Sequence, residues 1–433
     1  MAQLITTKHF GDQKSLAAWL DYIQALHPKS IAMGLDRVAQ VATALQIKPN
    51  FRIISVAGTN GKGSTCAMLE RIYRESGYKV GCYTSPHLLR YNERVRVNCL
   101  EVDDTSLCSA FAAVEAVRGS VQLTYFEFGT LAAVWYFMHC NLDVVILEVG
   151  LGGRLDAVNI FDPDCTIVTG VDLDHMDFLG DTKELISFEK AGIFRKDIPA
   201  ICGDAQPSSS LLQYADDIHA DLRLLGRDFS YITTSVGWNF QTQGGTDISL
   251  PKPELVGDFQ LNNAACVIQA IDSLQALLPV TESEMRRGLQ NVSLKGRYQV
   301  VNKSPKIILD VAHNPQAASA LAKNLHDDPC SGRTLAVFAM LADKDVKGVI
   351  DAVVVEINAW YVADINLARG AKAESLISLI EKVAIEKNIL QLHIKSFCST
   401  LDAYKQACMD AHENDRIIVY GSFFTVADVM TVV

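Results

Sequence analysis

The feature that most constrains the fold is a glycine-rich turn directly after a short apolar run. Residues 51–57 (FRIISVA) predict a buried strand, GTNGKGST follows at 58–65, and a helical pattern continues to Arg74. Glycines let backbone N–H groups approach an anion closely, the helix N-terminus adds positive potential, and Lys62 supplies a point charge for a phosphate group. The unit therefore predicts a nucleotide-binding P-loop at the end of a strand.

The match to the common P-loop pattern is imperfect. No glycine lies six residues before Lys62, and Gly63 separates the lysine from the first hydroxyl residue, Ser64. Either Ser64 or Thr65 is placed to reach a phosphate or a magnesium ion. A purely structural glycine-rich turn is the alternative interpretation.

Strand and helix patterns alternate along most of the chain. This rhythm predicts a doubly wound, mostly parallel sheet, and only 203–257 is irregular enough to suggest loops and short strands at one edge. A composition change near 291–300 precedes a second run of alternating patterns. We therefore expect an α/β fold in which a P-loop domain (1–294) is followed by a smaller Rossmann-like α/β domain (295–433).

Composition narrows the classes of function. The chain has 433 residues, a formal charge of −11 and 11 cysteines without a C-x-x-C pair. The charge disfavours a general nucleic-acid binder, and the cysteine pattern disfavours a disulfide framework or a zinc ribbon. We find no apolar signal core and no apolar run near the ~20 residues of a membrane span, so a cytoplasmic protein without membrane contact is expected.

Polar residues stand where predicted strands end. Glu148 closes the apolar run LDVVILEVG, and His175 lies in DLDHMD, just after another strand. A buried carboxylate is costly unless it is paired or binds a metal, and parallel sheets gather ligands beyond the carboxyl ends of their strands. These residues suggest a Mg²⁺ site, although His175 taken alone is more typical of a hydrogen-bonded structural histidine.

Three further segments carry polar residues whose roles composition leaves open. Lys190 lies in FEKAGIF on a predicted helix, where an isolated lysine is ordinarily a solvated surface charge. In the second domain, DVAHNP (310–315) and GSF (421–423) end two predicted strands. Both segments are expected at the same edge of that sheet.

Together these motifs resemble the Mur ligase superfamily and, within it, the folylpolyglutamate synthase family. GTNGKGST is similar to that family's P-loop, including the glycine between lysine and serine, and the remaining blocks follow in the expected order over roughly residues 58–426. They are TSPHL, YNERVRVN, EVGLGGRLDAVN, DLDHMDFLGDT, EKAGIF, KGRYQ, DVAHNP and ADKD. LTYFEFGTLAAVW resembles the bifunctional bacterial branch, which also makes dihydrofolate. Val158 and Phe259 depart from the usual Thr and His of the family.

The resemblance assigns roles by position. It implies ATP binding by the turn Gly58, Thr59, Asn60, Gly61, Lys62, Gly63, Ser64 and Thr65, and by Asn263, Arg297 and Asp310. It implies a magnesium site at Ser85, Glu148, His175 and Lys190, with Lys190 carbamylated into an anionic ligand. It places acceptor and glutamate contacts at Pro86, His87, Asp156, His313 and Ser422. Lys62, Lys190, Arg297 and His313 are the expected catalytic residues.

The implied activity is ATP-dependent joining of L-glutamate to dihydropteroate, and to tetrahydrofolate or folylpolyglutamates, through an acyl phosphate that yields ADP and phosphate. The implied cofactors are ATP and Mg²⁺, with room for a monovalent cation such as K⁺. A monomer with small-molecule partners is expected.

Two alternatives remain. A muropeptide ligase shares the chemistry but usually carries an N-terminal UDP-sugar domain, and only 57 residues precede Gly58. A nucleotide-dependent switch explains the P-loop but not TSPHL, EKAGIF and DVAHNP.

Overall fold

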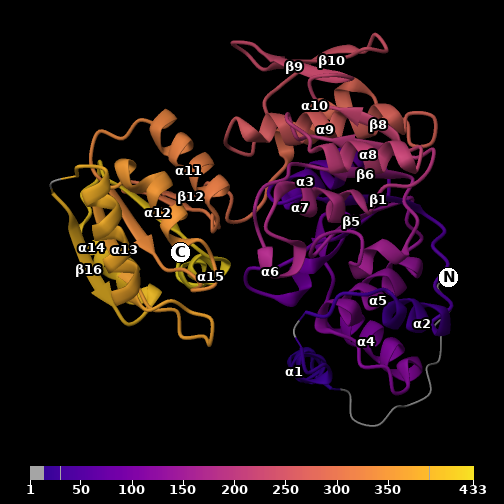
Figure 1. Cartoon of the computed structure of the whole chain (residues 1–433), viewed down its shortest axis with the longest axis horizontal. Helices are drawn as coiled ribbons and strands as arrows, with labels where there is room; N and C mark the ends of the chain where they lie inside the picture. Colours follow the sequence, from indigo (N-terminus) through magenta and orange to yellow (C-terminus); the bar gives the residue numbers. More distant parts are fainter. Residues whose placement is uncertain (1–13, 30, 390) are drawn as a thin grey trace.

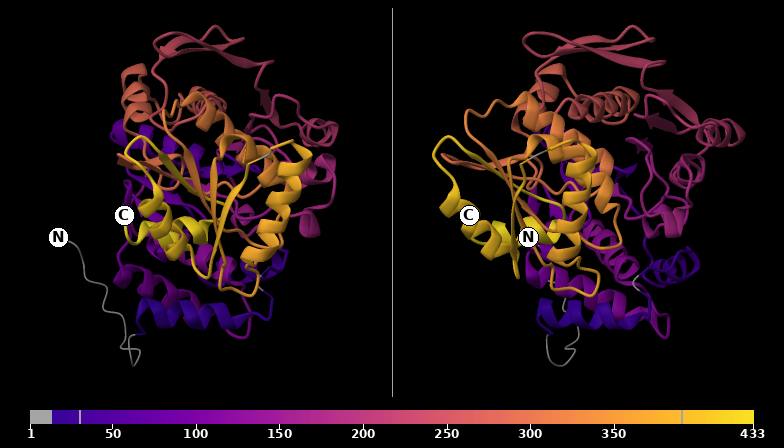
Figure 2. Two further views of the ribbon diagram at one scale, coloured as in Figure 1. Left: turned by 90° about the vertical axis from the view of Figure 1, so that its left-hand side faces the viewer. Right: turned by 60° about the vertical axis from the view of Figure 1, so that its left-hand side comes forward.

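The computed structural model describes residues 14–29, 31–389 and 391–433 and contains two α/β units side by side (Figures 1 and 2). The N-terminal unit runs from α1 to α10, and the C-terminal unit runs from β12 to α15. Both units are helix–sheet–helix sandwiches, as the alternating patterns predict. No helix among these residues combines the length and apolar character needed to cross a membrane.

The N-terminal unit is built on an eight-stranded sheet with the order β4-β3-β2-β5-β1-β6-β7-β8. Its strands are β1 (Arg52–Ala57), β2 (Val80–Tyr83), β3 (Val95–Val97), β4 (Leu100–Glu101), β5 (Val144–Glu148), β6 (Cys165–Val168), β7 (Pro199–Cys202) and β8 (Asp221–Leu224). The pairs β2–β3 and β3–β4 are antiparallel, and the other strand pairs of this sheet are parallel. The P-loop strand β1 lies between β5 and β6. Every residue of β5 is buried, which is typical of a central parallel strand.

Helices cover both faces of this sheet. One face packs against α1 (Leu16–Leu26), α2 (Asp36–Ala44), α4 (Asp104–Arg118), α5 (Tyr125–Met138), α7 (Lys183–Ala191) and α8 (Ser209–Asp217). The opposite face packs against α3 (Lys62–Glu75), α9 (Phe259–Ser273) and α10 (Glu282–Asn291). The short helices α6 (Met176–Leu179), η1 (Tyr91–Arg94) and η2 (Ala157–Ile160) lie in the loops.

The segment expected to be irregular, 203–257, is more ordered than its composition predicts. It contains α8, the edge strand β8 and a separate antiparallel sheet of three strands, visible at the top of Figure 1. These strands are β9 (Phe229–Thr233), β10 (Trp238–Thr242) and β11 (Asp247–Leu250). Trp238 and Phe240 anchor this sheet in the same core as α3 and α9. A few buried aromatic side chains therefore stabilise strands whose outer faces are mostly polar.

The C-terminal unit has a six-stranded sheet with the order β12-β13-β17-β14-β15-β16, and only β12 and β13 pair antiparallel. Its strands are β12 (Gln299–Lys303), β13 (Lys306–Leu309), β14 (Thr334–Phe338), β15 (Ala359–Ala363), β16 (His393–Phe397) and β17 (Arg416–Tyr420). One face packs against α11 (Pro315–Asp327), α12 (Val346–Val353), η3 (Val354–Glu356) and α13 (Ala373–Glu386), and the other against α14 (Thr400–Asp410) and α15 (Phe423–Met430). The expected fold class is confirmed.

Candidate active site

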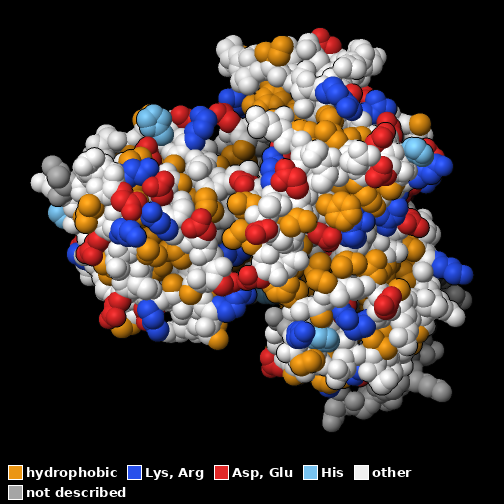
Figure 3. Space-filling model, viewed as in Figure 1, with side chains coloured by type: hydrophobic (Ala, Val, Ile, Leu, Met, Phe, Trp, Pro, Cys, Tyr) orange, Lys and Arg blue, Asp and Glu red, His pale blue; other side chains and the backbone are white. Residues whose placement is uncertain are grey.

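The predicted site residues line one cavity between the two units, except Thr65, which is fully buried behind the turn and does not reach the cavity. The cavity has a volume of about 1110 Å³ and is lined by the P-loop, by the ends of β2, β5 and β6, and by loops of the C-terminal unit. Figure 3 shows the surface hollowed between the two lobes, with acidic and basic side chains at its rim. This is where an open parallel sheet is expected to bind a ligand, beyond the carboxyl ends of its strands.

The P-loop connects β1 to α3 through two glycines in left-handed or otherwise restricted backbone conformations. Gly58 has φ +147° and Gly61 has φ +86°. A Cβ atom on Gly58 would lie 2.0 Å from Thr169 Oγ1, and one on Gly61 would lie 2.4 Å from Asn263 Oδ1. Only glycine fits at these positions. The turn therefore places the first N–H groups of α3 at the cavity wall, ready for an anion.

Two lysines meet at one carbonyl oxygen of this turn. Lys62 Nζ donates to Gly58 O at 2.9 Å and to Thr59 O at 3.1 Å, while Lys190 Nζ donates to the same Gly58 O at 2.9 Å. Burial, together with the Lys62 charge, lowers the pKa of Lys190 to about 7. The solvated surface lysine that composition alone favours for Lys190 is therefore wrong, because the end of α7 packs under the P-loop and leaves this side chain 5% exposed.

Glu148 lies at the end of β5, where its carboxylate is only 4% exposed. Its Oε2 accepts a hydrogen bond of 2.9 Å from the Ser85 backbone N–H, and its Oε1 lies 4.0 Å from the position a Cβ on Gly63 would take. Burial raises the pKa of Glu148, and the Lys62 charge and the Ser85 hydrogen bond oppose that shift. One carboxylate oxygen therefore faces the first turn of α3.

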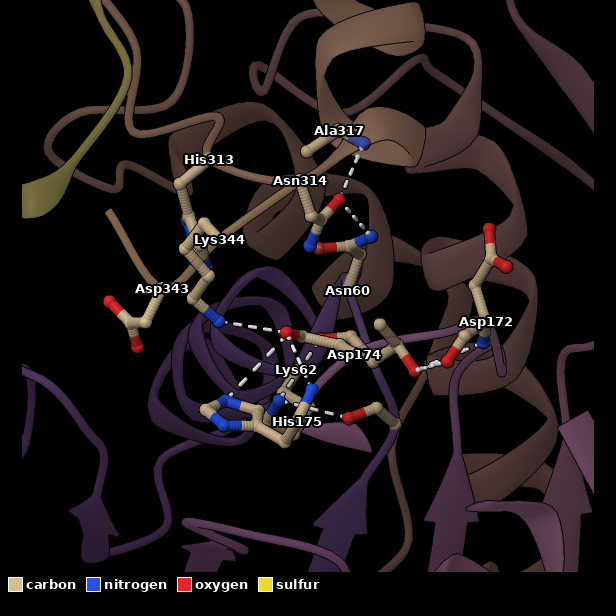
Figure 4. A network of polar contacts seen from close by, with 12 residues as sticks. Asn60, Lys62, Asp172, Asp174, His175, His313, Asn314, Ala317, Asp343 and Lys344 are labelled. Carbon is tan, nitrogen blue, oxygen red and sulfur yellow. Dashed lines mark hydrogen bonds and ion pairs between the residues drawn. The ribbon is translucent and has the colours of Figure 1, made fainter. Parts of the chain in front are cut away.

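His175 stands at the start of α6 with an αL backbone conformation, φ +52°. Its ring lies 3.7 Å from Asp174, and Asp174 pairs at 2.8 Å with Lys344 of the C-terminal unit (Figure 4). Partial burial and the Lys344, Lys62 and Lys190 charges lower the pKa of His175 to about 4. Burial alone would raise the pKa of Asp174, but His175 and Lys344 bring it to about 2. The imidazole is therefore neutral near pH 7 and available as a ligand.

The C-terminal unit contributes a cation, a carboxylate and a histidine. Asp310 accepts from the backbone N–H groups of Tyr298 and Ala312, both at 2.8 Å. Burial raises the pKa of Asp310, and the Arg297 guanidinium opposes the shift. His313 Nδ1 lies 2.8 Å from Val311 O, which fixes the proton on Nδ1 and leaves Nε2 as an acceptor. Burial lowers the pKa of His313 to about 4.

The Ser422 hydroxyl already has hydrogen-bond partners within the C-terminal unit. Ser422 lines the cavity, but its side chain caps α15 by accepting from the Thr425 N–H at 3.0 Å and contacts Thr425 Oγ1 at 2.7 Å. Its hydroxyl therefore holds a helix end in this structure. Any substrate contact at this position would come from a group that already has partners.

The TSPHL loop is stabilised by hydrogen bonds with the segment that follows it. The Glu93 carboxylate accepts from the backbone N–H groups of Leu88, Leu89 and Arg90 at 2.7 to 3.0 Å. Arg94 Nε donates to His87 Nδ1 at 2.8 Å, and burial together with the Arg94 charge lowers the pKa of His87 to about 4. His87 is therefore neutral, with its proton on Nε2.

Pro86, which is exposed, and Asp156, which is buried, line the same cavity. Asp156 accepts from the Leu151 and Val158 N–H groups at 2.9 and 3.0 Å. Burial nevertheless raises its pKa to about 7. The side chain can therefore act as a hydrogen-bond donor or acceptor near neutral pH.

Two amide side chains of α9 back the P-loop. Gln260 Nε2 donates to Ser64 Oγ at 3.2 Å, and Asn263 Nδ2 donates to Gln260 Oε1 at 2.9 Å. Thr65 is fully buried, and its Oγ1 has no hydrogen-bond partner among the described residues. Asn263 is therefore rigidly placed beside the turn, as a nucleotide-binding amide would be.

The arrangement fits a hard cation only in part. Within the described ranges, no group of three His, Cys, Asp or Glu side chains is close enough to hold a metal. Mg²⁺ usually keeps several waters and uses one or two carboxylates plus substrate phosphates, so Glu148 facing the P-loop is sufficient as an anchor. The lowered pKa of Lys190 leaves part of its amine unprotonated near pH 7, and only the unprotonated amine can be carbamylated. Carbamylation would add an anionic oxygen ligand to the site.

Sequence reasoning did not identify Asp174, Lys344 or Arg94 as site residues, although each lies within one of the family motifs. Asp174 and Lys344 belong to segments 170 residues apart, and their pairing depends on how the two units dock. Arg94 acts through His87. A search for charged residues that lie next to predicted strand ends inside these motifs could have identified all three residues.

Comparison with known proteins agrees with this architecture. The Mur ligase middle domain matches residues 56–271, and the Mur ligase glutamate ligase domain matches residues 296–423. These two models match the two α/β units in order, so the chain is a Mur ligase.

Within that class, the similarity extends over nearly the whole chain. A dihydrofolate synthase/folylpolyglutamate synthase of Escherichia coli K12 is 44% identical over 96% of this chain and 95% of its own length. The structure of E. coli FolC in complex with DHPP and ADP has a TM-score of 0.91 and 45% identity, and covers 97% of both chains. A bifunctional folylpolyglutamate synthase/dihydrofolate synthase with Mn, AMPPNP and L-glutamate bound has a TM-score of 0.88 and 42% identity, over 96% of this chain and 98% of its own. The chain belongs to the dihydrofolate synthase/folylpolyglutamate synthase family of Mur ligases.

Proposed function

We propose that this chain is an ATP-dependent ligase that joins L-glutamate to dihydropteroate, and to tetrahydrofolate and its polyglutamates. The observation that carries the proposal is the single cavity lined by the P-loop on one side and by Arg297, Asp310 and His313 on the other. Each group suits a different part of an acyl-phosphate ligation. The family relatives, which bind ADP or AMPPNP and glutamate, support the same chemistry.

In the first step, a carboxylate oxygen of the acceptor attacks the γ-phosphorus of ATP, and the bond to the bridging oxygen breaks to release ADP. Lys62 and the N–H groups of residues 58–64 hold the phosphates. Arg297, Asn263 and Asp310 are proposed to complete the nucleotide contacts, and the Asp310 carboxylate interacts electrostatically with Arg297. Fixed charges directed at the transferring group stabilise the transition state without reorganisation.

In the second step, the amine of glutamate attacks the acyl carbon, and phosphate leaves with its electron pair. The amine must lose a proton, and neutral His313, with Nε2 free, is suited to accept it. Closure of the C-terminal unit over the nucleotide excludes water, which would otherwise hydrolyse the acyl phosphate.

A divalent cation, when bound, would neutralise charge on the phosphates. Glu148, His175, Ser85 and a carbamylated Lys190 are the residues we propose to hold it. Pro86, His87 and Asp156 are proposed to contact the acceptor, and His313 and Ser422 to lie near glutamate.

We further propose that residues 1–294 and 295–433 form the two domains. Their hydrophobic cores contain different helices, and the boundary falls between α10 and β12. A monomer acting in the cytoplasm on small-molecule substrates accords with this organisation.

The test is a coupled ADP-release assay with L-glutamate and one of three acceptors: dihydropteroate, tetrahydrofolate or a muramyl peptide. We expect ADP release with the two pterin acceptors, and only when glutamate is also present. Turnover with the muramyl peptide alone would indicate a muropeptide ligase. ATP hydrolysis at a rate independent of both acceptor and glutamate would indicate a nucleotide-dependent switch.

A further inference from the structure

The P-loop touches the C-terminal unit through a reciprocal pair of side-chain amides. Asn60 Nδ2 donates to Asn314 Oδ1 at 3.2 Å, and Asn314 Nδ2 donates to Asn60 Oδ1 at 3.0 Å (Figure 4). The exposed Gln316 also accepts from Asn60 Nδ2. The two asparagines are 254 residues apart, so this pair exists only when the units are docked.

The conformation of Asn60 affects the shape of the P-loop turn, because Asn60 lies within it. Asn60 lies between Gly58 and Gly61, and its backbone carbonyl accepts a 2.6 Å hydrogen bond from Thr169 Oγ1 of the N-terminal unit. The N-terminal unit therefore holds the backbone of Asn60, while the C-terminal unit holds its side chain. Fixing both parts restricts the turn whose N–H groups face the proposed phosphates.

The Asn314 side chain is held in one orientation by burial and by its role as a helix cap. It is 4% exposed, and its Oδ1 caps α11 by accepting from the Ala317 N–H at 2.9 Å. Capping fixes the side-chain torsions, so the amide meets Asn60 in a set orientation. The helix cap therefore orders the Asn314 side chain before docking, so docking itself loses little further side-chain entropy at this residue.

We infer that Asn314 is a positioning residue for the P-loop, and that the Asn60–Asn314 pair couples nucleotide binding to docking of the C-terminal unit. The inference rests on the proposed function in taking the P-loop ligand to be a nucleoside triphosphate. Coupling is reciprocal: if docking favours the phosphate-binding form of the turn, bound nucleotide favours docking to the same extent. Asn314 thus acts through Asn60 and needs no contact with the nucleotide.

A structural role for Asn314 can be separated from a positioning role by substitution. Asn314→Ser keeps a good helix cap but is too short to reach the Asn60 amide. Asn314→Ala loses both the cap and the pair. Asn60→Ala removes the pair from the other side. Ser399→Ala is a matched control, because Ser399 caps α14 in the same unit and lies outside the cavity lining.

The experiment measures the Kd of Mg²⁺–AMPPNP by calorimetry, together with KM for ATP, kcat and Tm, in the full chain. We expect Asn314→Ser and Asn60→Ala each to raise Kd and the KM for ATP about fivefold to tenfold, because two neutral hydrogen bonds are lost. For Asn314→Ser, kcat at saturating ATP should stay within about twofold of the wild-type value. The double variant should resemble either single variant. Ser399→Ala should lower Tm and leave Kd unchanged.

The inference is overturned if Asn314→Ser binds AMPPNP like the wild type while Asn314→Ala loses only thermal stability, since Asn314 would then be a helix cap alone. Additive effects in the double variant would also overturn it, because they would show that the two residues act independently. Failure of the proposed ligase function has a different signature: AMPPNP binding and its coupling would persist, but no acceptor would support ADP release.

Discussion

At the scale of single residues, the site is organised around the Gly58 carbonyl, which two lysines share. Lys62 is exposed to the cavity, whereas Lys190 is buried beneath the turn. Two like charges at one acceptor are unfavourable, so one of them is expected to be neutral near pH 7. Burial and the Lys62 charge lower the pKa of Lys190 to about 7, so Lys190 is the lysine that loses its proton around neutral pH.

Lys62→Ala should lower kcat by roughly 10²–10³, because it removes one fixed charge from the transferring phosphate. The fold should survive, since Lys62 Nζ donates its hydrogen bonds to carbonyl groups of the turn itself. Steady-state kinetics and a melting curve measure both quantities. Turnover close to that of the wild type would remove Lys62 from the proposed chemistry.

Lys190 is expected to react with carbon dioxide at a lower pH than an ordinary lysine does. Only the neutral amine forms a carbamate, and a folded pKa of about 7 makes that form abundant near neutrality. After removal of carbon dioxide, recovery of activity at constant dissolved CO₂ should rise between about pH 6 and about pH 8 and then level off. A rise that continues to about pH 10 would show that the Lys190 pKa is not lowered.

The same residue offers a chemical rescue. Lys190→Ala should be inactive and should regain part of its activity with acetate, which supplies the missing carboxylate. Lys196→Ala, at an exposed position just beyond α7, is the matched control and should behave as the wild type does. A fully active Lys190→Ala would return Lys190 to a structural role.

At the scale of elements, the short segment between α10 and β12 carries Arg297 into the cavity. Its guanidinium carbon lies 5.5 Å from the centroid of the Phe423 ring, and it interacts electrostatically with Asp310 and Glu148. Arg297→Ala should lower kcat/KM for ATP by roughly tenfold or more while changing Tm little. Lys295→Ala, in the same segment but outside the cavity lining, should change neither. Loss of activity that merely follows a large drop in Tm would make Arg297 structural.

Much of the element pattern was predictable because it depends on local chemistry. The all-buried β5 and the turn between Gly58 and Ser64 follow from apolar runs, glycines and a helix start. Short strands were expected in 203–257, but their pairing into the separate β9–β11 sheet was not, because the strands are half exposed and only a few aromatic side chains, such as Trp238, enter the core. Short antiparallel strands of this kind lack a strong local signal.

The site was predictable only where roles follow from position in a motif. Glu148 could be inferred because a charge ends an apolar strand. The Asp174–Lys344 ion pair and the Asn60–Asn314 pair could not, because each joins segments that only the docking of the two units brings together. Composition alone could not show the burial of Lys190, since it depends on how α7 packs under the P-loop; only the resemblance to the family placed this lysine in the site.

At the scale of the whole molecule, two α/β units divide the reaction between them. The N-terminal unit holds the phosphate turn and Glu148, and the C-terminal unit brings Arg297 and His313 to the opposite wall of the cavity. Neither unit alone encloses the site. This division is consistent with a reaction in which an activated intermediate must be kept from water until the amine arrives.

The central claim is that an acyl phosphate links the two steps, and an isotope label tests it directly. Dihydropteroate carrying a heavy oxygen isotope in its carboxyl group is incubated with ATP, Mg²⁺ and L-glutamate, and the released phosphate is analysed by mass spectrometry. The account predicts that ADP is the nucleotide product and that each phosphate released carries one oxygen from the acceptor. Unlabelled phosphate, or AMP and pyrophosphate as products, would contradict it.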